Sequence, residues 1–113
     1  MITRASEQEK SLRENMRGGN GTVQLTALMK QLPANARLFS VLRLAPGTSI
    51  GYHVHENETE LFYFAEGSGR VCDDGVYYDV SAGDAMATPN GHGHGVENTG
   101  DVDLVLVAAI ILD

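Results

Sequence analysis

The sequence predicts an all-β domain, either a sandwich or a small barrel. Short runs rich in Val, Leu, Ile, Phe and Tyr follow one another through residues 22–111. Clusters of Gly, Asn, Asp, Ser and Pro separate them at intervals of about eight to twelve residues. Asp74 and Gly75 lie between two such runs, which is a strong signal for a tight β-hairpin. Many short strands with frequent turns favour stacked or closed antiparallel sheets over a parallel α/β fold.

The first 21 residues are expected to form a polar N-terminal arm. The spacing of Ser6 and Glu9 resembles a helix capping box, which allows a short helix there, although no apolar stripe follows. The run from Gly18 to Gly21 is a flexible break. We therefore place the arm at residues 1–21 and a single barrel domain at residues 22–113, a length typical of one domain.

Strands are expected in the remainder, wherever β-branched, aromatic and other apolar residues cluster between turns. In the second run, the even-numbered positions from Leu38 to Leu44 share one face, and the odd-numbered positions from Phe39 to Arg43 share the other. The predicted strands are residues 22–29, 37–45, 51–55, 60–66, 70–73, 76–80, 84–88, 94–98 and 102–111.

The charge of the chain argues against nucleic acid and anionic membranes as partners, because the 113 residues carry a net charge of −7. The charge is unevenly placed. Residues 1–43 are basic overall, whereas residues 44–113 hold Arg70 as their one Lys or Arg among many acids. Either the first third packs against an acidic surface, its own or a partner subunit's, or both regions are separately solvated.

The single cysteine, Cys72, cannot form an internal disulfide, which fits a reducing compartment. Residues 1–17 are charged and lack the apolar core of a signal peptide. The apolar run over residues 102–112 is too short to span a bilayer. We therefore expect a cytoplasmic protein without a membrane segment.

The histidines form a pattern that is typical of a metal site. His53 and His55 stand two apart on a predicted strand, so both side chains leave the same face. His92 and His94 repeat this spacing, and Glu60 opens the strand that follows His55. Imidazole nitrogen and carboxylate oxygen both reach a first-row divalent ion at about 2.0–2.2 Å. A His-x-His pair alone is a weak signal, so the interpretation depends on the residues around it.

Two spaced strings of residues resemble the two motifs of the cupin family at every specified position. Gly averages about 7% and Pro about 5% of residues, so these matches are not accidental. The first string is Gly47, His53, His55, Glu60 and Gly67, and the second is Gly83, Pro89, Gly91, His94 and Asn98.

The resemblance implies a double-sheet jelly roll with a short N-terminal arm. It also implies that His53, His55, Glu60 and His94 point inwards and bind one divalent ion. Three imidazoles and one carboxylate suit Fe(II), Mn(II), Co(II) or Ni(II) and also accept Zn(II). We assign Asn98 a local turn role, a side-chain bond to the backbone, and no chemistry.

Side chains near the predicted ligands have either a pocket role or a plain packing role. Phe62 and Phe64 share the face of Glu60, and with Met86 and Val96 they would wall an apolar pocket; core packing explains all four equally well. Arg43 would clamp a substrate carboxylate if it faced inwards.

Two polar features remain at the rim. His92 is a candidate general acid or base, or else an exposed loop histidine. Glu56 and Glu58 would make an acidic mouth, which weighs against a di-acid such as oxalate.

Two functional hypotheses stay open. The first is a metal-dependent enzyme acting on a small molecule, of the dioxygenase, decarboxylase, isomerase or lyase type. The second is a non-catalytic barrel that binds metal and a small ligand, for instance as a sensor. A metal-free sugar-binding barrel would not need all four ligands. We also expect a homodimer, because a short chain has a marginal core and the charges of its two parts are complementary.

Overall fold

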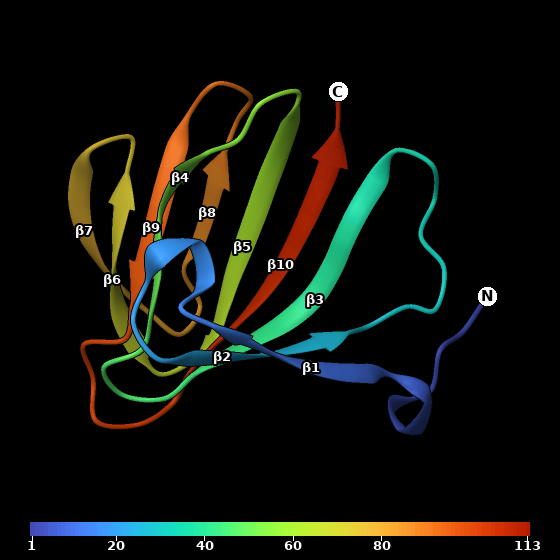
Figure 1. Ribbon diagram of the computed structural model, residues 1–113, viewed down its shortest axis with the longest axis horizontal. Coiled ribbons are helices and arrows are strands. Elements are labelled where there is room, and N and C mark those ends of the chain that lie inside the picture. The colour runs from blue at the N-terminus through green and yellow to red at the C-terminus, as the bar shows by residue number, and fades with distance from the viewer.

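The computed structural model describes all 113 residues and consists of two antiparallel sheets that face each other (Figure 1). Two single 3₁₀ turns, η1 (Ala5–Glu7) and η2 (Met16–Gly18), are its helical elements, and no helix is long and apolar enough to cross a membrane. The six-stranded sheet has the order β1 (Glu9–Glu14), β2 (Thr22–Ala27), β3 (Ala36–Leu44), β10 (Leu104–Leu112), β5 (Glu58–Glu66) and β8 (Ala85–Thr88). The four-stranded sheet has the order β4 (Ser49–Val54), β9 (Gly93–Glu97), β6 (Ser68–Asp73) and β7 (Val76–Ser81). This is the predicted double-sheet jelly roll.

The hydrophobic core fills the space between the two sheets. Strand alternation sends every second side chain inwards, so Leu42 and Leu44 of β3 are buried and Arg43 between them is not. The inward residues of both sheets form one cluster: Val23, Leu25, Leu42, Leu44, Ile50, Phe62, Phe64, Val71, Val96, Leu104, Leu106 and Ala108. The core therefore holds the two sheets together and fixes which side chains face each other between them.

Each predicted strand overlaps one observed strand, from β2 to β10. The Asp74-Gly75 hairpin is also confirmed, because Asp73 pairs with Val76 and both turn residues have positive φ, 52° and 93°. Asn98 is buried, and its Oδ1 accepts the Gly100 amide, as expected for a residue that holds a turn.

The N-terminal arm contains a strand that was not predicted. β1 pairs with β2 along its whole length and forms one edge of the six-stranded sheet. The helical turn also begins earlier than expected: the Glu7 carboxylate accepts the Arg4 amide at 3.1 Å, in place of the predicted Ser6 and Glu9 pair. The division at residue 21 stays a prediction.

Candidate metal centre

Four side chains from three strand regions meet between the sheets. His53 lies on β4, His55 follows the end of that strand, and His94 lies on β9 directly opposite His53. Glu60 comes from β5 in the other sheet. One nitrogen or oxygen from each of the four lies within 4.8 Å of the others, so the cluster could hold a metal ion.

Three of these atoms form a nearly equilateral triangle. The Nε2 atoms of His55 and His94 are 3.0 Å apart, and Glu60 Oε1 lies 2.9 Å from each of them. Two ligands that bind one ion at right angles, each at about 2.1 Å, are separated by about 3.0 Å, whereas tetrahedral angles would give about 3.4 Å. The donor set therefore fits one face of an octahedral ion.

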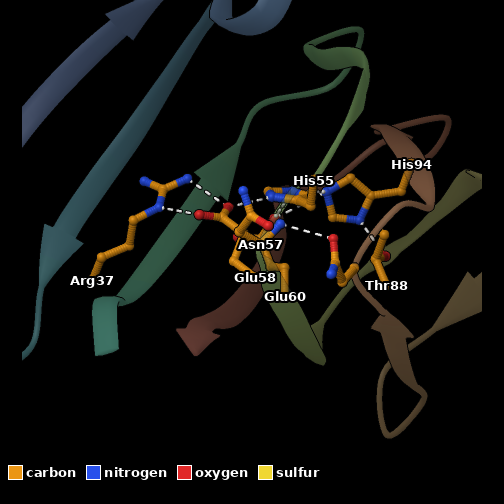
Figure 2. Close-up of polar contacts among 8 residues, drawn as sticks. Arg37, His55, Asn57, Glu58, Glu60, Thr88 and His94 are labelled. Carbon is orange, nitrogen blue, oxygen red and sulfur yellow. Dashed lines mark hydrogen bonds and ion pairs between the residues drawn. The ribbon is translucent and has the colours of Figure 1, made fainter. Parts of the chain in front are cut away.

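The second nitrogen of each imidazole has its own hydrogen-bond partner. His53 Nδ1 lies 2.7 Å from the Gly51 carbonyl, and His55 Nδ1 lies 2.5 Å from Glu58 Oε2. His94 Nδ1 lies 2.7 Å from the hydroxyl of Thr88 (Figure 2). A protonated Nδ1 leaves Nε2 with a bare lone pair, which is the tautomer that a metal ligand requires. Lone pairs of two imidazoles facing a carboxylate repel one another unless a cation lies between them.

Glu58 is held in place from two sides. Arg37 donates from Nε to Oε1 at 2.6 Å and from Nη2 to Oε2 at 2.7 Å, while His55 approaches Oε2 (Figure 2). The Arg37 guanidinium, with a smaller contribution from His55, lowers the pKa of the Glu58 carboxyl to about 2. Glu58 is therefore a buried, neutralised partner of a ligand, and its predicted place in an acidic mouth is wrong.

His53 differs from the other ligands in being only partly buried. Burial nevertheless lowers its pKa to about 4, against the opposing effect of its bond to the Gly51 carbonyl. The imidazole is thus neutral at pH 7 and its lone pair is available to an ion.

The comparisons with known proteins agree with this geometry. Residues 40–110 match the model of the cupin domain family. The chain belongs to the cupin family. A protein of Thermotoga maritima named oxalate-binding protein is 41% identical over 99% of this chain and 94% of its own length. A crystal structure from the same organism, described as a predicted oxalate decarboxylase, is 41% identical, covers both chains completely and has a TM-score of 0.94.

Two further relatives are more distant. A protein of Arthroderma benhamiae named probable oxalate decarboxylase is 34% identical over 76% of this chain, which spans 22% of that longer protein. KdgF from Halomonas sp. has a TM-score of 0.78 at 18% identity, covering 100% of this chain and 96% of its own, and shows the shared fold alone.

The four residues predicted to wall an apolar pocket beside the cupin centre do not all contact a ligand. Phe62 stacks on the His94 ring, with centroids 4.7 Å apart and an interplanar angle of 12°. Phe64 and Val96 are buried within the hydrophobic core, and Met86 packs against its edge. Phe62 is therefore the one member of this group shown in contact with a ligand side chain.

Arg43 does not face the cupin centre. Its Nη1 lies 3.2 Å from Asp103 Oδ2, and both side chains are substantially exposed. Because inward and outward positions alternate along β3, the inward burial of Leu42 and Leu44 sends Arg43 to the opposite face. The interpretation of Arg43 as a pocket residue is corrected accordingly.

His92 is engaged outside the cluster. Its Nδ1 lies 2.9 Å from Asp74 Oδ2, and both side chains are about half exposed. Bonding to His92 lowers the pKa of the Asp74 carboxyl. His92 therefore lies at the solvent-exposed rim, outside the cluster of ligands. Its role as a general acid or base stays a hypothesis.

Sequence reasoning missed the partners of the ligand imidazoles. Thr88 directly precedes Pro89 of the second cupin motif, and Glu58 lies three residues after His55, but neither spacing alone indicates contact with a ligand. Arg37 is twenty-one residues from Glu58 and meets it only through the fold.

Proposed function

We propose that this cupin binds one divalent metal ion through His53, His55, Glu60 and His94, and that the ion binds a small dicarboxylate of the size of oxalate. The observation that carries the proposal is the triangle of two Nε2 atoms and one carboxylate oxygen, spaced at 2.9–3.0 Å. Three protein atoms on one face of an octahedral ion, with a fourth from His53, leave coordination positions for oxygen ligands.

The charge of such a centre favours an anion. A divalent ion with three neutral imidazoles and one carboxylate has a net charge of about +1, so an oxalate dianion is attracted to it. Glu58 does not oppose this attraction, because Arg37 neutralises it. The names of the Thermotoga and Arthroderma relatives support the same ligand class.

Binding is the first candidate because the acid and base groups around the centre already have partners. Glu58 is bonded to Arg37 and His55, and His92 is paired with Asp74. Decarboxylation at the same centre is the second candidate, in which the C–C bond of oxalate breaks, carbon dioxide leaves and the remaining carbon takes up a proton from solvent to give formate; it is favoured by the relative named a probable oxalate decarboxylase. The bound ion would supply a Lewis acid that holds the carboxylate, and the residues of the cluster would fix its orientation.

Isothermal titration calorimetry of the metal-loaded protein with oxalate tests the proposal. We expect saturable binding at one oxalate per metal, and no binding to metal-free protein. Formate release, followed in the same samples, separates decarboxylation from binding without turnover. A protein that carries its full complement of metal and shows no heat with oxalate contradicts the proposed ligand class.

A further inference from the structure

The arm places the backbone of Arg17 against β4, two residues from the candidate ligand His53. The turn η2 packs on β4 so closely that a Cβ added to Gly51 would lie 2.0 Å from the Arg17 carbonyl oxygen. The carbonyl of Gly51 in turn accepts from His53 Nδ1 at 2.7 Å. The backbone of Arg17 therefore contacts Gly51, the residue whose carbonyl orients the candidate ligand His53. In Figure 1 the η2 coil lies beside β4.

His53 marks the accessible side of the centre. Of the four cluster residues, His55, Glu60 and His94 are buried, and His53 alone is partly exposed. A ligand that reaches the ion from solvent therefore passes His53, the residue beside which η2 lies.

Arg17 is exposed and forms no ion pair, in contrast to three other cations of the chain. Lys30 is paired with Glu7, Arg37 with Glu58 and Arg43 with Asp103. Arg70 lies 4.3 Å from the centre of the Tyr77 ring. The guanidinium of Arg17 is thus available to an anion.

The backbone of Arg17 is in the left-handed region, with φ 55° and ψ 31°. An L residue with a long side chain is disfavoured there, and glycine would relieve the strain. The turn is fixed by neighbours: the Gly18 amide donates to Asn15, and Asn20 and Ser49 exchange two hydrogen bonds of 2.8 Å. Strain that the surroundings maintain in this way is typical of positions where the side chain has a function.

We propose that Arg17 binds the carboxylate group of the ligand that projects from the metal towards solvent, and so makes the centre selective for dicarboxylates over monocarboxylates. This inference rests on the proposed function above. A guanidinium offers two parallel N–H donors that match the two oxygens of a carboxylate. The ion would hold one end of the ligand, and Arg17 would hold the other.

The test compares Arg17→Ala and Arg17→Gly with the wild-type protein, each loaded with Mn(II) and titrated with oxalate and with acetate. We expect oxalate affinity to fall about tenfold to a hundredfold, the range for loss of a charge-assisted carboxylate contact. Affinity for Mn(II) alone and for acetate should stay within about threefold. The midpoint of thermal unfolding of Arg17→Gly should equal or exceed that of the wild type, because the strain is removed.

Arg13→Ala is the matched control. Arg13 is an exposed residue of β1, which pairs with β2, and it also forms no ion pair, so the variant loses the same charge from a different element. Its oxalate affinity should stay close to the wild-type value. Equal oxalate affinities for wild type, Arg13→Ala and both Arg17 variants overturn the role of Arg17 and leave the proposed function intact. Wild-type protein that binds Mn(II) but not oxalate overturns both.

Discussion

Each imidazole of the candidate centre is oriented by a different kind of neighbour: a backbone carbonyl for His53, a carboxylate for His55 and a hydroxyl for His94. Of these three neighbours, the Glu58 carboxylate is further held by a second side chain, because it accepts two hydrogen bonds from Arg37. Partners of this kind fix the ring orientation and the tautomer of a ligand. Arg37 should therefore act on the ion by holding Glu58 in the position that orients His55.

We expect Arg37→Ala to weaken metal binding by up to about tenfold, less than loss of the direct partner of a ligand, because Glu58 would no longer be held against His55. The buried Glu58 carboxylate would also lose its charged partner, which should lower the free energy of unfolding by about 1–3 kcal/mol. Metal titration and urea denaturation measure the two effects.

Arg43→Ala is the matched control, because the Arg37 and Arg43 side chains are both 43% exposed and both pair with an acid. Its partner Asp103 is exposed, so the free energy of unfolding should fall by less than about 1 kcal/mol. Metal affinity should not change. Equal effects of the two substitutions on metal affinity would show that Arg37 does not support the metal centre through Glu58.

Among the elements, the sequence predicts β2 to β10 because apolar side chains recur between turn residues. It predicts the four ligands through the resemblance to the two cupin motifs, since the spacing of the histidines alone is a weak signal. β1 could not be predicted in this way. Its one apolar residue, Leu12, is 66% exposed, and the strand exists because its backbone pairs with β2. The contacts of Arg37 and Thr88 were hidden for a similar reason, since they depend on which strands meet across the fold.

The contact between η2 and β4 is close enough that a single added methyl group on Gly19 should disrupt it. A Cβ on Gly19 would lie 2.1 Å from the Ser49 carbonyl oxygen, a backbone atom that cannot rotate away. We therefore expect Gly19→Ala to separate η2 from β4. The Ser49 amide, which donates to the Asn20 carbonyl at 2.8 Å, should then exchange its hydrogen at least about tenfold faster.

The neighbouring substitution Gly18→Ala is the control for this experiment. A Cβ there meets nothing within 4 Å, so its cost is limited to the strain of φ +80°, about 1–2 kcal/mol. Exchange of the Ser49 amide should remain near the wild-type rate. Equal protection of Ser49 in the two variants would mean that η2 tolerates the overlap and is not held by close backbone contact.

For the whole molecule, the outward face of the six-stranded sheet carries an apolar band that supports the predicted homodimer. Register places its side chains side by side on β3, β10 and β5, in two rows: Phe39, Ala109 and Leu61, then Val41, Val107 and Tyr63. Leu61 and Tyr63 are 40% and 51% exposed. Contiguous exposed apolar surface of this kind marks interaction sites.

We expect light scattering to give about twice the chain mass of 12.1 kDa for the wild type, and the chain mass for Leu61→Lys/Tyr63→Lys. Two added charges in the centre of an apolar contact cannot be buried without large cost. Val76→Lys/Tyr77→Lys, in exposed positions of β7, should stay dimeric. A wild-type mass near that of one chain would contradict the homodimer.

Metal content tests the central claim, that four side chains from the two sheets form one metal centre. The wild-type protein, purified without chelator or incubated with Fe(II), Mn(II), Ni(II) or Zn(II) and then desalted, should contain close to one divalent ion per chain by elemental analysis. His94→Ala should lose most of this metal and keep the circular dichroism of a β protein, because the core and turns hold the barrel together. Wild-type protein with less than about a tenth of an equivalent after every incubation, or His94→Ala with full occupancy, would contradict the account.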